Sequence, residues 1–172
     1  MSLEVGPATA HLRALAHPLR LRLLSLLTAG PASAAELARE TGGAHANISY
    51  HLRTLDAAGL VELDSETSVR GGRQRRYRVT DIQRPPGEVG PATDNAWPAA
   101  LAAELRRRWP EQVADQPRTT ADAELWVDPE VWTQVVEHVR TAMLLLHSAA
   151  QPPRTPGTLR TSTTAALFGM RP

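Results

Sequence analysis

Residues 45–58 carry hydrogen-bonding side chains at a spacing suited to reading nucleic acid. Ile48, Leu52 and Leu55 recur four and then three residues apart, so they share one face of a predicted helix. The other face carries amide, hydroxyl, imidazole and guanidinium groups, which bond base edges and phosphates. The candidate DNA-binding residues on this helix are Asn47, Ser49, Tyr50, His51 and Arg53. The imidazole of His51 could instead bond within the protein, and the short polar side chains could simply be solvated.

The positive charge of the chain is concentrated in one short segment. The net charge is only +1, and the cationic side chains other than histidine are all arginines. Residues 67–84 hold six arginines and one acid, Asp81, whereas residues 85–172 hold eight arginines and ten acids. A local excess of guanidinium groups suits a phosphate-binding surface, although an ordinary solvated hairpin could carry the same charge. The candidate phosphate contacts in this segment are Arg70, Arg73, Arg75 and Arg76.

The elements predicted around these residues begin with helices and end with a hairpin. Two helices are predicted over 8–28, further helices over 34–41 and 45–58, and strands over 60–66 and 75–80. Ser33 and Glu36 have capping-box spacing at the start of the third helix. Gly59 follows the fourth helix, at the position where a left-handed residue commonly ends a helix. This order predicts a mainly α fold with a small β-hairpin, an α+β winged helix-turn-helix.

Three stretches within residues 8–82 carry motifs in a characteristic order. They read ALAHPLRLRLLSLL, ELARETGGAHANISYHLRTLDAAGLVE and RGGRQRRYRVT. The second contains the recognition-helix pattern Ser-Tyr-His-Leu-Arg-x-Leu, and the third contains the wing pattern Arg-Gly-Gly-Arg-x-x-x-Tyr. In type, order and spacing these motifs resemble those of the ArsR-type family of bacterial repressors. The resemblance covers less than half of the chain.

The resemblance implies a sequence-specific transcriptional regulator, in most cases a repressor, that binds double-stranded DNA. It further implies a homodimer on a palindromic operator. The helix over 45–58 would lie in the major groove, and the arginine-rich wing over 67–78 would lie on the backbone or in the minor groove. A small-molecule effector of unknown identity would be compatible with this class. The alternatives are a metal-responsive sensor of the same family and a winged-helix module that binds protein instead of DNA.

The rest of the chain is predicted to form a linker and a second unit. Proline and glycine crowd residues 83–98, which indicates a linker between a DNA-binding domain over 8–82 and a segment over 99–172. In the last segment, helices are predicted over 99–109 and 129–148, and strands over 124–127 and 158–168. The apolar stripe of the longer helix and the four tryptophans, all at or after position 97, indicate a unit for dimerisation or effector binding.

Several kinds of chemistry are excluded or disfavoured by the residue types. The absence of cysteine excludes disulfides, thiolate metal sites and cysteine nucleophiles. His138 and His147 are nine residues apart on one predicted helix, too far to share a metal ion, so neither a metal site nor a cofactor is predicted. No nucleophile is paired with a base and no glycine loop cradles phosphate, so we expect no catalytic residues and no enzyme. Without a signal segment or a long apolar run, the protein is expected to be cytoplasmic.

Overall fold

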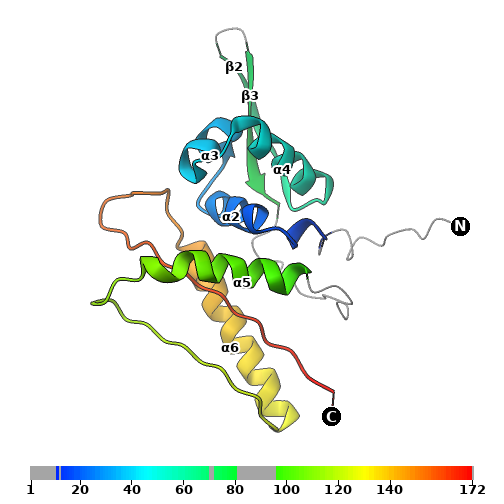
Figure 1. Cartoon of the computed structure of the whole chain (residues 1–172), viewed down its shortest axis with the longest axis vertical. Coiled ribbons are helices and arrows are strands. Elements are labelled where there is room, and N and C mark those ends of the chain that lie inside the picture. The colour runs from blue at the N-terminus through cyan, green and yellow to red at the C-terminus, as the bar shows by residue number, and fades with distance from the viewer. Residues whose placement is uncertain (1–10, 12, 70–71, 81–95, 172) are drawn as a thin grey trace, which may run out of the picture.

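A computed structural model of the chain describes residues 11, 13–69, 72–80 and 96–171. Its helices are α2 (Pro18–Leu27), α3 (Ala34–Thr41), α4 (His45–Ala57), α5 (Ala96–Arg108), the short 3-10 helix η1 (Trp109–Glu111) and α6 (Pro129–Ser148) (Figure 1). Its strands are β1 (Ala32–Ser33), β2 (Val61–Val69) and β3 (Gly72–Val79). The mixture of helices with a small antiparallel sheet confirms the predicted α+β class.

Helix starts follow from capping side chains that the sequence supplies. The ring Nδ1 of His17 accepts a hydrogen bond from the backbone N–H of Leu19 at 3.1 Å, and this begins α2. In the predicted capping box, the Ser33 hydroxyl accepts from the Glu36 N–H, and the Glu36 carboxylate accepts from the Ser33 N–H at 2.7 Å. Asp128 caps α6 in the same way by accepting from the N–H of Glu130 at 2.8 Å. Each cap satisfies an N–H group that the helix itself leaves unpaired.

The sheet is antiparallel, with strand order β1-β3-β2. The two long strands pair from Val61 opposite Val79 as far as Val69 opposite Gly72, with a register shift between Leu63 and Ser65. The hairpin is therefore longer than the strands predicted over 60–66 and 75–80. β1 was not predicted; its two residues pair with Tyr77 and Arg76 of β3. A strand this short carries no periodicity of its own.

One apolar core holds the helices against the base of the hairpin. Its buried residues are Leu23, Leu27, Leu37, Ile48, Leu52, Leu55, Val61 and Tyr77. The prediction that Ile48, Leu52 and Leu55 face inward is thereby confirmed. Burial of side chains of this size contributes roughly 1.5–3 kcal/mol each. This core fixes the orientation of α4 relative to the sheet.

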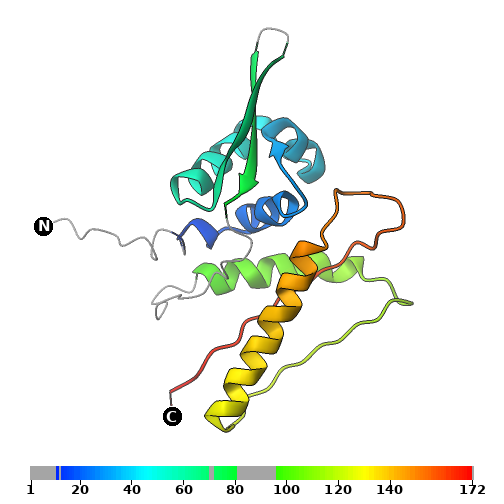
Figure 2. The same cartoon turned by 180° about the vertical axis from the view of Figure 1, so that it is seen from behind.

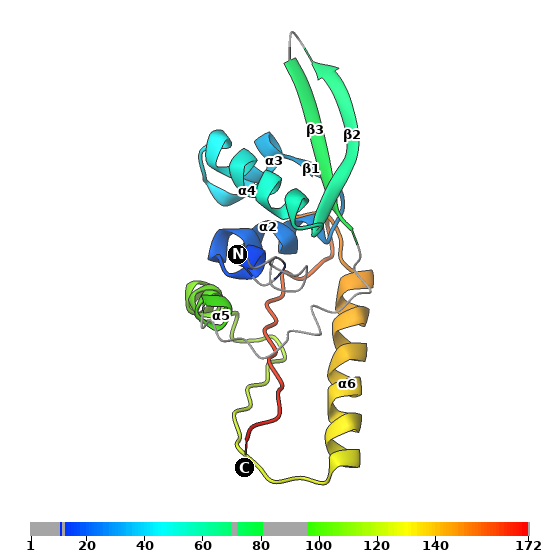
Figure 3. The same cartoon turned by 90° about the vertical axis from the view of Figure 1, so that its right-hand side faces the viewer.

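The second half of the chain packs much less. α5 lies along α2, on the side away from α4 (Figures 1 and 3), and buries Ala100 and Glu104. α6 has the predicted bounds but buries none of its residues. The strands predicted over 124–127 and 158–168 are wrong, because neither segment is a strand in the structure. Residues 96–98 belong to α5, not to the predicted linker, and the linker's remaining residues lie outside the described ones.

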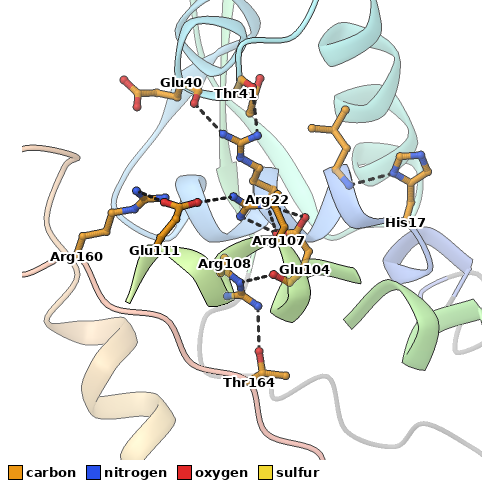
Figure 4. A network of polar contacts seen from close by, with 11 residues as sticks. His17, Arg22, Glu40, Thr41, Glu104, Arg107, Arg108, Glu111, Arg160 and Thr164 are labelled. Carbon is orange, nitrogen blue, oxygen red and sulfur yellow. Dashed lines mark hydrogen bonds and ion pairs between the residues drawn. The ribbon is translucent and has the colours of Figure 1, made fainter. Parts of the chain in front are cut away.

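Ion pairs and hydrogen bonds tie the segment after α6 to the rest of the molecule. Arg160 pairs with Glu111 at 2.7 Å, and Arg108 donates to the Thr164 hydroxyl at 2.9 Å (Figure 4). Arg154 pairs with Glu40, near the end of α3, at 2.7 Å. Exposed contacts of this kind each contribute little to stability. In the part of the chain that the structure describes, no helix is both long and apolar enough to cross a membrane.

Candidate nucleic-acid interface

Two glycines make the turn that joins α3 to α4. Gly42 ends α3 with a left-handed backbone, φ 71°, which non-glycine residues adopt at a cost. A Cβ on Gly43 would lie 3.2 Å from the Thr41 hydroxyl and 3.3 Å from Cδ1 of the fully buried Ile48. The short turn therefore brings the two helices into close contact and leaves one side of α4 facing away from the core. This is the geometry of a helix-turn-helix unit.

The outward side of α4 carries most of the predicted reading residues. Asn47, Tyr50 and Arg53 are exposed, and Tyr50 is 57% exposed to solvent. Ser49 is partly exposed at the edge of this face. The N-cap residue of α4 is Ala44, which has no side-chain acceptor. Among the described residues, no side chain therefore caps the first turn of α4. The face thus presents an amide, a phenol and a guanidinium, which suit base edges and phosphates.

His51 is a correction to the predicted set. It is only 5% exposed, on the core side of α4, and so does not lie on the exposed face of the helix. Its ring centroid lies 4.5 Å from that of His17, and its Nδ1 has no hydrogen-bond partner among the described residues. Burial, followed by the neighbouring His17 and Arg20, lowers the pKa of His51, which favours the neutral ring. The alternative of a role inside the protein is therefore the one that fits.

Arg76 binds the protein itself more than it faces outward. Its guanidinium donates to both carboxylate oxygens of Glu36 at 2.8 and 2.9 Å, and to the carbonyl of Pro31 at 2.5 Å. The Glu36 carboxylate also accepts from the N–H and the hydroxyl of Ser33. The backbone hydrogen bond from Ser33 lowers the pKa of Glu36 most, and Arg76 lowers it further. This cluster joins β3 to the start of α3, so Arg76 is engaged within the protein, and its contact with phosphate stays a prediction.

Comparison with known proteins agrees with this geometry. Residues 15–64 match the family model described as a helix-turn-helix domain. The chain contains a helix-turn-helix domain. The matched segment includes the whole of α2, α3 and α4, and a domain of this kind indicates a DNA-binding regulator and points away from an enzyme. Comparison with curated proteins gives no match.

The hairpin beside the helix-turn-helix domain presents two of the predicted arginines. Arg73 and Arg75 have side chains that are 79% and 56% exposed. Both pair with one carboxylate, that of Glu66, at 3.0 and 3.6 Å. Two guanidinium groups on one carboxylate leave an excess of positive charge for a phosphate. Arg70 lies outside the described residues.

The hairpin is less basic than the charge of residues 67–84 alone indicates, because β2 carries acidic side chains. The register of β2 on β3 places three acids beside the arginines, because Glu62 pairs with Arg78 at 2.6 Å and Glu66 pairs with the two arginines near the tip. The third acid, Asp64, lies 4.0 Å from Arg78. The position of these acids beside the arginines depends on strand pairing, which the sequence pattern does not reveal. The positive charge available to DNA is therefore concentrated toward the tip.

The hairpin extends past α3 and α4 at one end of the molecule, whereas α6 lies toward the other end (Figures 1 and 2). The outward face of α4 and the basic part of the hairpin thus belong to the same half of the molecule. Among the described residues, no group of three or more His, Asp or Glu side chains is arranged to hold a metal ion.

Proposed function

We propose that the chain is a sequence-specific transcriptional regulator that inserts α4 into the major groove of DNA. The observation that carries this proposal is the exposed face with Asn47, Tyr50 and Arg53, on the second helix of a helix-turn-helix domain. An α-helix fits the major groove, where asparagine and arginine can make paired hydrogen bonds to adenine and guanine. Ser49, at the edge of the face, is suited to a phosphate or base contact.

The hairpin would bind the DNA backbone or minor groove beside this helix. Arg73 and Arg75 are the described arginines best placed for it, because both are exposed and share one carboxylate. Arg70, within the wing predicted over 67–78, belongs to the same proposal. Backbone contacts of this kind add affinity for all sequences and make binding sensitive to salt.

Repression and a homodimer on a palindromic operator complete the proposal. Support for both comes from the motifs that resemble ArsR-type repressors. A two-fold symmetric dimer would bind two half-sites about one helical turn apart.

Selection of bound DNA from a random pool tests the proposal directly. We expect an inverted repeat to be enriched. Asn47→Ala and Arg53→Ala should each relax the preference at one position of the half-site, by roughly 1–3 kcal/mol. Arg73→Ala with Arg75→Ala should weaken binding to specific and random DNA alike and reduce the salt slope by about two per chain.

Arg118→Ala, an exposed arginine beyond α5, is the matched control and should leave both properties unchanged. Equal losses on specific and random DNA for both sets of variants would contradict the division of roles. Failure to enrich any motif, with no mobility shift at low salt, would contradict DNA binding and favour a protein-interaction module.

A further inference from the structure

α6 exposes an apolar surface that the chain itself does not cover. The helix runs for 20 residues, about 30 Å, and buries none of them. Val131, Val135 and Leu145 are 49%, 43% and 69% exposed. An amphipathic helix is stabilised mainly by packing of its apolar face, and this one has no such packing in the chain.

The least exposed residues of α6 form a seam with coiled-coil spacing. They are Trp132, Val136, Val139 and Met143, and Leu146, which is 41% exposed, continues the same spacing. Successive members are four, three, four and three residues apart, which keeps them on one line along a helix that packs against another helix. The seam is centred on Val139, since Trp132 and Leu146 each lie seven residues from it. A second copy of α6 turned end for end would therefore meet the same pattern.

The charges of α6 are arranged to fit such a copy. Glu130 and Glu137 are seven residues apart, as are Arg140 and His147, and Glu137 lies three residues before Arg140. These spacings put all four side chains on one flank of the seam, acids in the first half and bases in the second. Both acid–base pairs are centred on the same point, between residues 138 and 139. An antiparallel copy would bring each acid opposite a base, and antiparallel helix dipoles also attract.

A parallel copy would not give this match. In a parallel pair, the flank on one side of the seam in one helix meets the flank on the opposite side of the seam in the other helix. The charged flank of one copy would therefore meet the flank of the other copy that carries Val131, Val135 and Leu145. Charges would then be covered by apolar side chains without a partner. The charged flank also holds a depression of about 340 Å³, lined by Trp132, Thr133, Val136, Glu137 and Arg140, into which a side chain from the second copy can pack.

We propose that α6 is a homodimer interface in which two copies of the helix pack antiparallel about a two-fold axis near Val139. This inference rests on the proposed function, which includes a homodimer. It adds which helix forms the dimer interface and that the two helices run antiparallel. α6 stands apart from α4 and the hairpin (Figure 3), so the pairing leaves the candidate DNA-binding face uncovered.

Single-cysteine variants test the orientation cleanly, because the chain has no cysteine of its own. Under mild oxidation or with a short bismaleimide, Val139→Cys should cross-link to itself. Trp132→Cys and Leu146→Cys should not cross-link separately, because antiparallel packing puts identical ends far apart, but a mixture of the two should. Thr141→Cys, on the polar side of α6, is the matched control and should give little product.

Self-cross-linking of Trp132→Cys and of Leu146→Cys, with no product that joins the two different variants in their mixture, would show parallel packing and overturn the proposal. No cross-linking of any seam variant above the Thr141→Cys level would overturn the interface itself. These measurements use the protein without DNA, whereas the DNA selection depends on α4. An enriched motif without seam cross-links would leave the proposed function standing, and seam cross-links without DNA binding would contradict only that function.

Charge reversal gives a second, independent readout. Glu137→Arg and Arg140→Glu should each weaken dimerisation by about tenfold in sedimentation equilibrium, since each places like charges together twice across the two-fold axis. The double variant restores the opposite charges and should return to within about threefold of the original affinity. Failure of the double variant to recover, with α6 helicity intact by circular dichroism, would contradict the antiparallel register.

Discussion

His51 and His17 show how packing decides the role of a polar residue in this protein. On a helix, position 51 lies between the outward positions of Asn47 and Tyr50 and the inward position of Leu52. Helical spacing alone therefore fits either face. The decision comes from α2, which places His17 4.5 Å from His51 and makes this side of α4 interior.

The two imidazoles should make the stability of the domain depend on pH. Burial, followed by Arg20, lowers the pKa of His17; burial, followed by His17 and Arg20, lowers the pKa of His51. Tyr50 contacts the edge of the His51 ring. The unfolded chain therefore binds protons to these histidines more readily than the folded chain does. The stability that the neutral pair allows is complete above pH 6.5, and it is lost as the pH falls from there toward the lowered pKa values of the folded protein.

We expect His51→Leu to make chemical-denaturation stability fall less between pH 7.5 and pH 5.5 than it does in the original protein. The substitution removes a titrating group and the unpartnered buried Nδ1 at similar volume. His45→Gln, at an exposed position of the same helix, is the control and should keep the original slope. An unchanged slope in His51→Leu would contradict the assignment of the pH dependence to this pair.

The arginines illustrate the same limit on prediction from sequence. Arg73, Arg75 and Arg76 are equivalent as residue types, and all three were predicted to contact phosphate. What separates them is the pairing of β3 with β1, which brings Arg76 beside Glu36, forty residues away in the chain. Exposed Arg73 and Arg75 keep the predicted role as a proposal.

Among the elements, those with capping signals were predicted best. α3 and α6 have the predicted bounds because Ser33 with Glu36, and Asp128 with Pro129, define their first turns locally. The segments at 124–127 and 158–168 have residues typical of strands but no partner edge, and a strand is stabilised by its neighbours more than by its own composition.

The turn between α3 and α4 should be sensitive to a single methyl group. We expect Gly42→Ala to lower the free energy of unfolding by about 1 kcal/mol, because alanine is strained at φ 71° although nothing lies within 4 Å of the added carbon. Gly169→Ala, also with open space around it, is the matched control and should change stability by less than about 0.5 kcal/mol. Equal stability of both variants in urea denaturation would show that the backbone of Gly42 is not under this constraint.

The interactions that stabilise the fold are distributed unevenly along the chain. The helix-turn-helix domain has a shared apolar core, whereas residues beyond α5 are held by exposed contacts such as Arg154 with Glu40 and Arg160 with Glu111. Trp126 is 90% exposed, and no residue of α6 is buried. The sequence predicted a helix with an apolar stripe that must be buried against another surface. The antiparallel orientation proposed for a second copy follows only when the positions of the charged residues are compared with those of the seam residues.

Hydrogen exchange should therefore depend on protein concentration in one half of the chain only. If α6 pairs with a second copy, its amides should exchange roughly fifteenfold more slowly at a total chain concentration one hundred times the dissociation constant than in the dilute monomer, because about a fifteenth of the chains then remain monomeric. Amides of α4 should exchange at the same rate at both concentrations, since the core that holds them lies within one chain. In Glu137→Arg, the protection of α6 should shift to higher concentration while that of α4 stays fixed. Protection of α6 that is strong and independent of concentration would mean that contacts within one chain stabilise it, which contradicts a dimer interface on this helix.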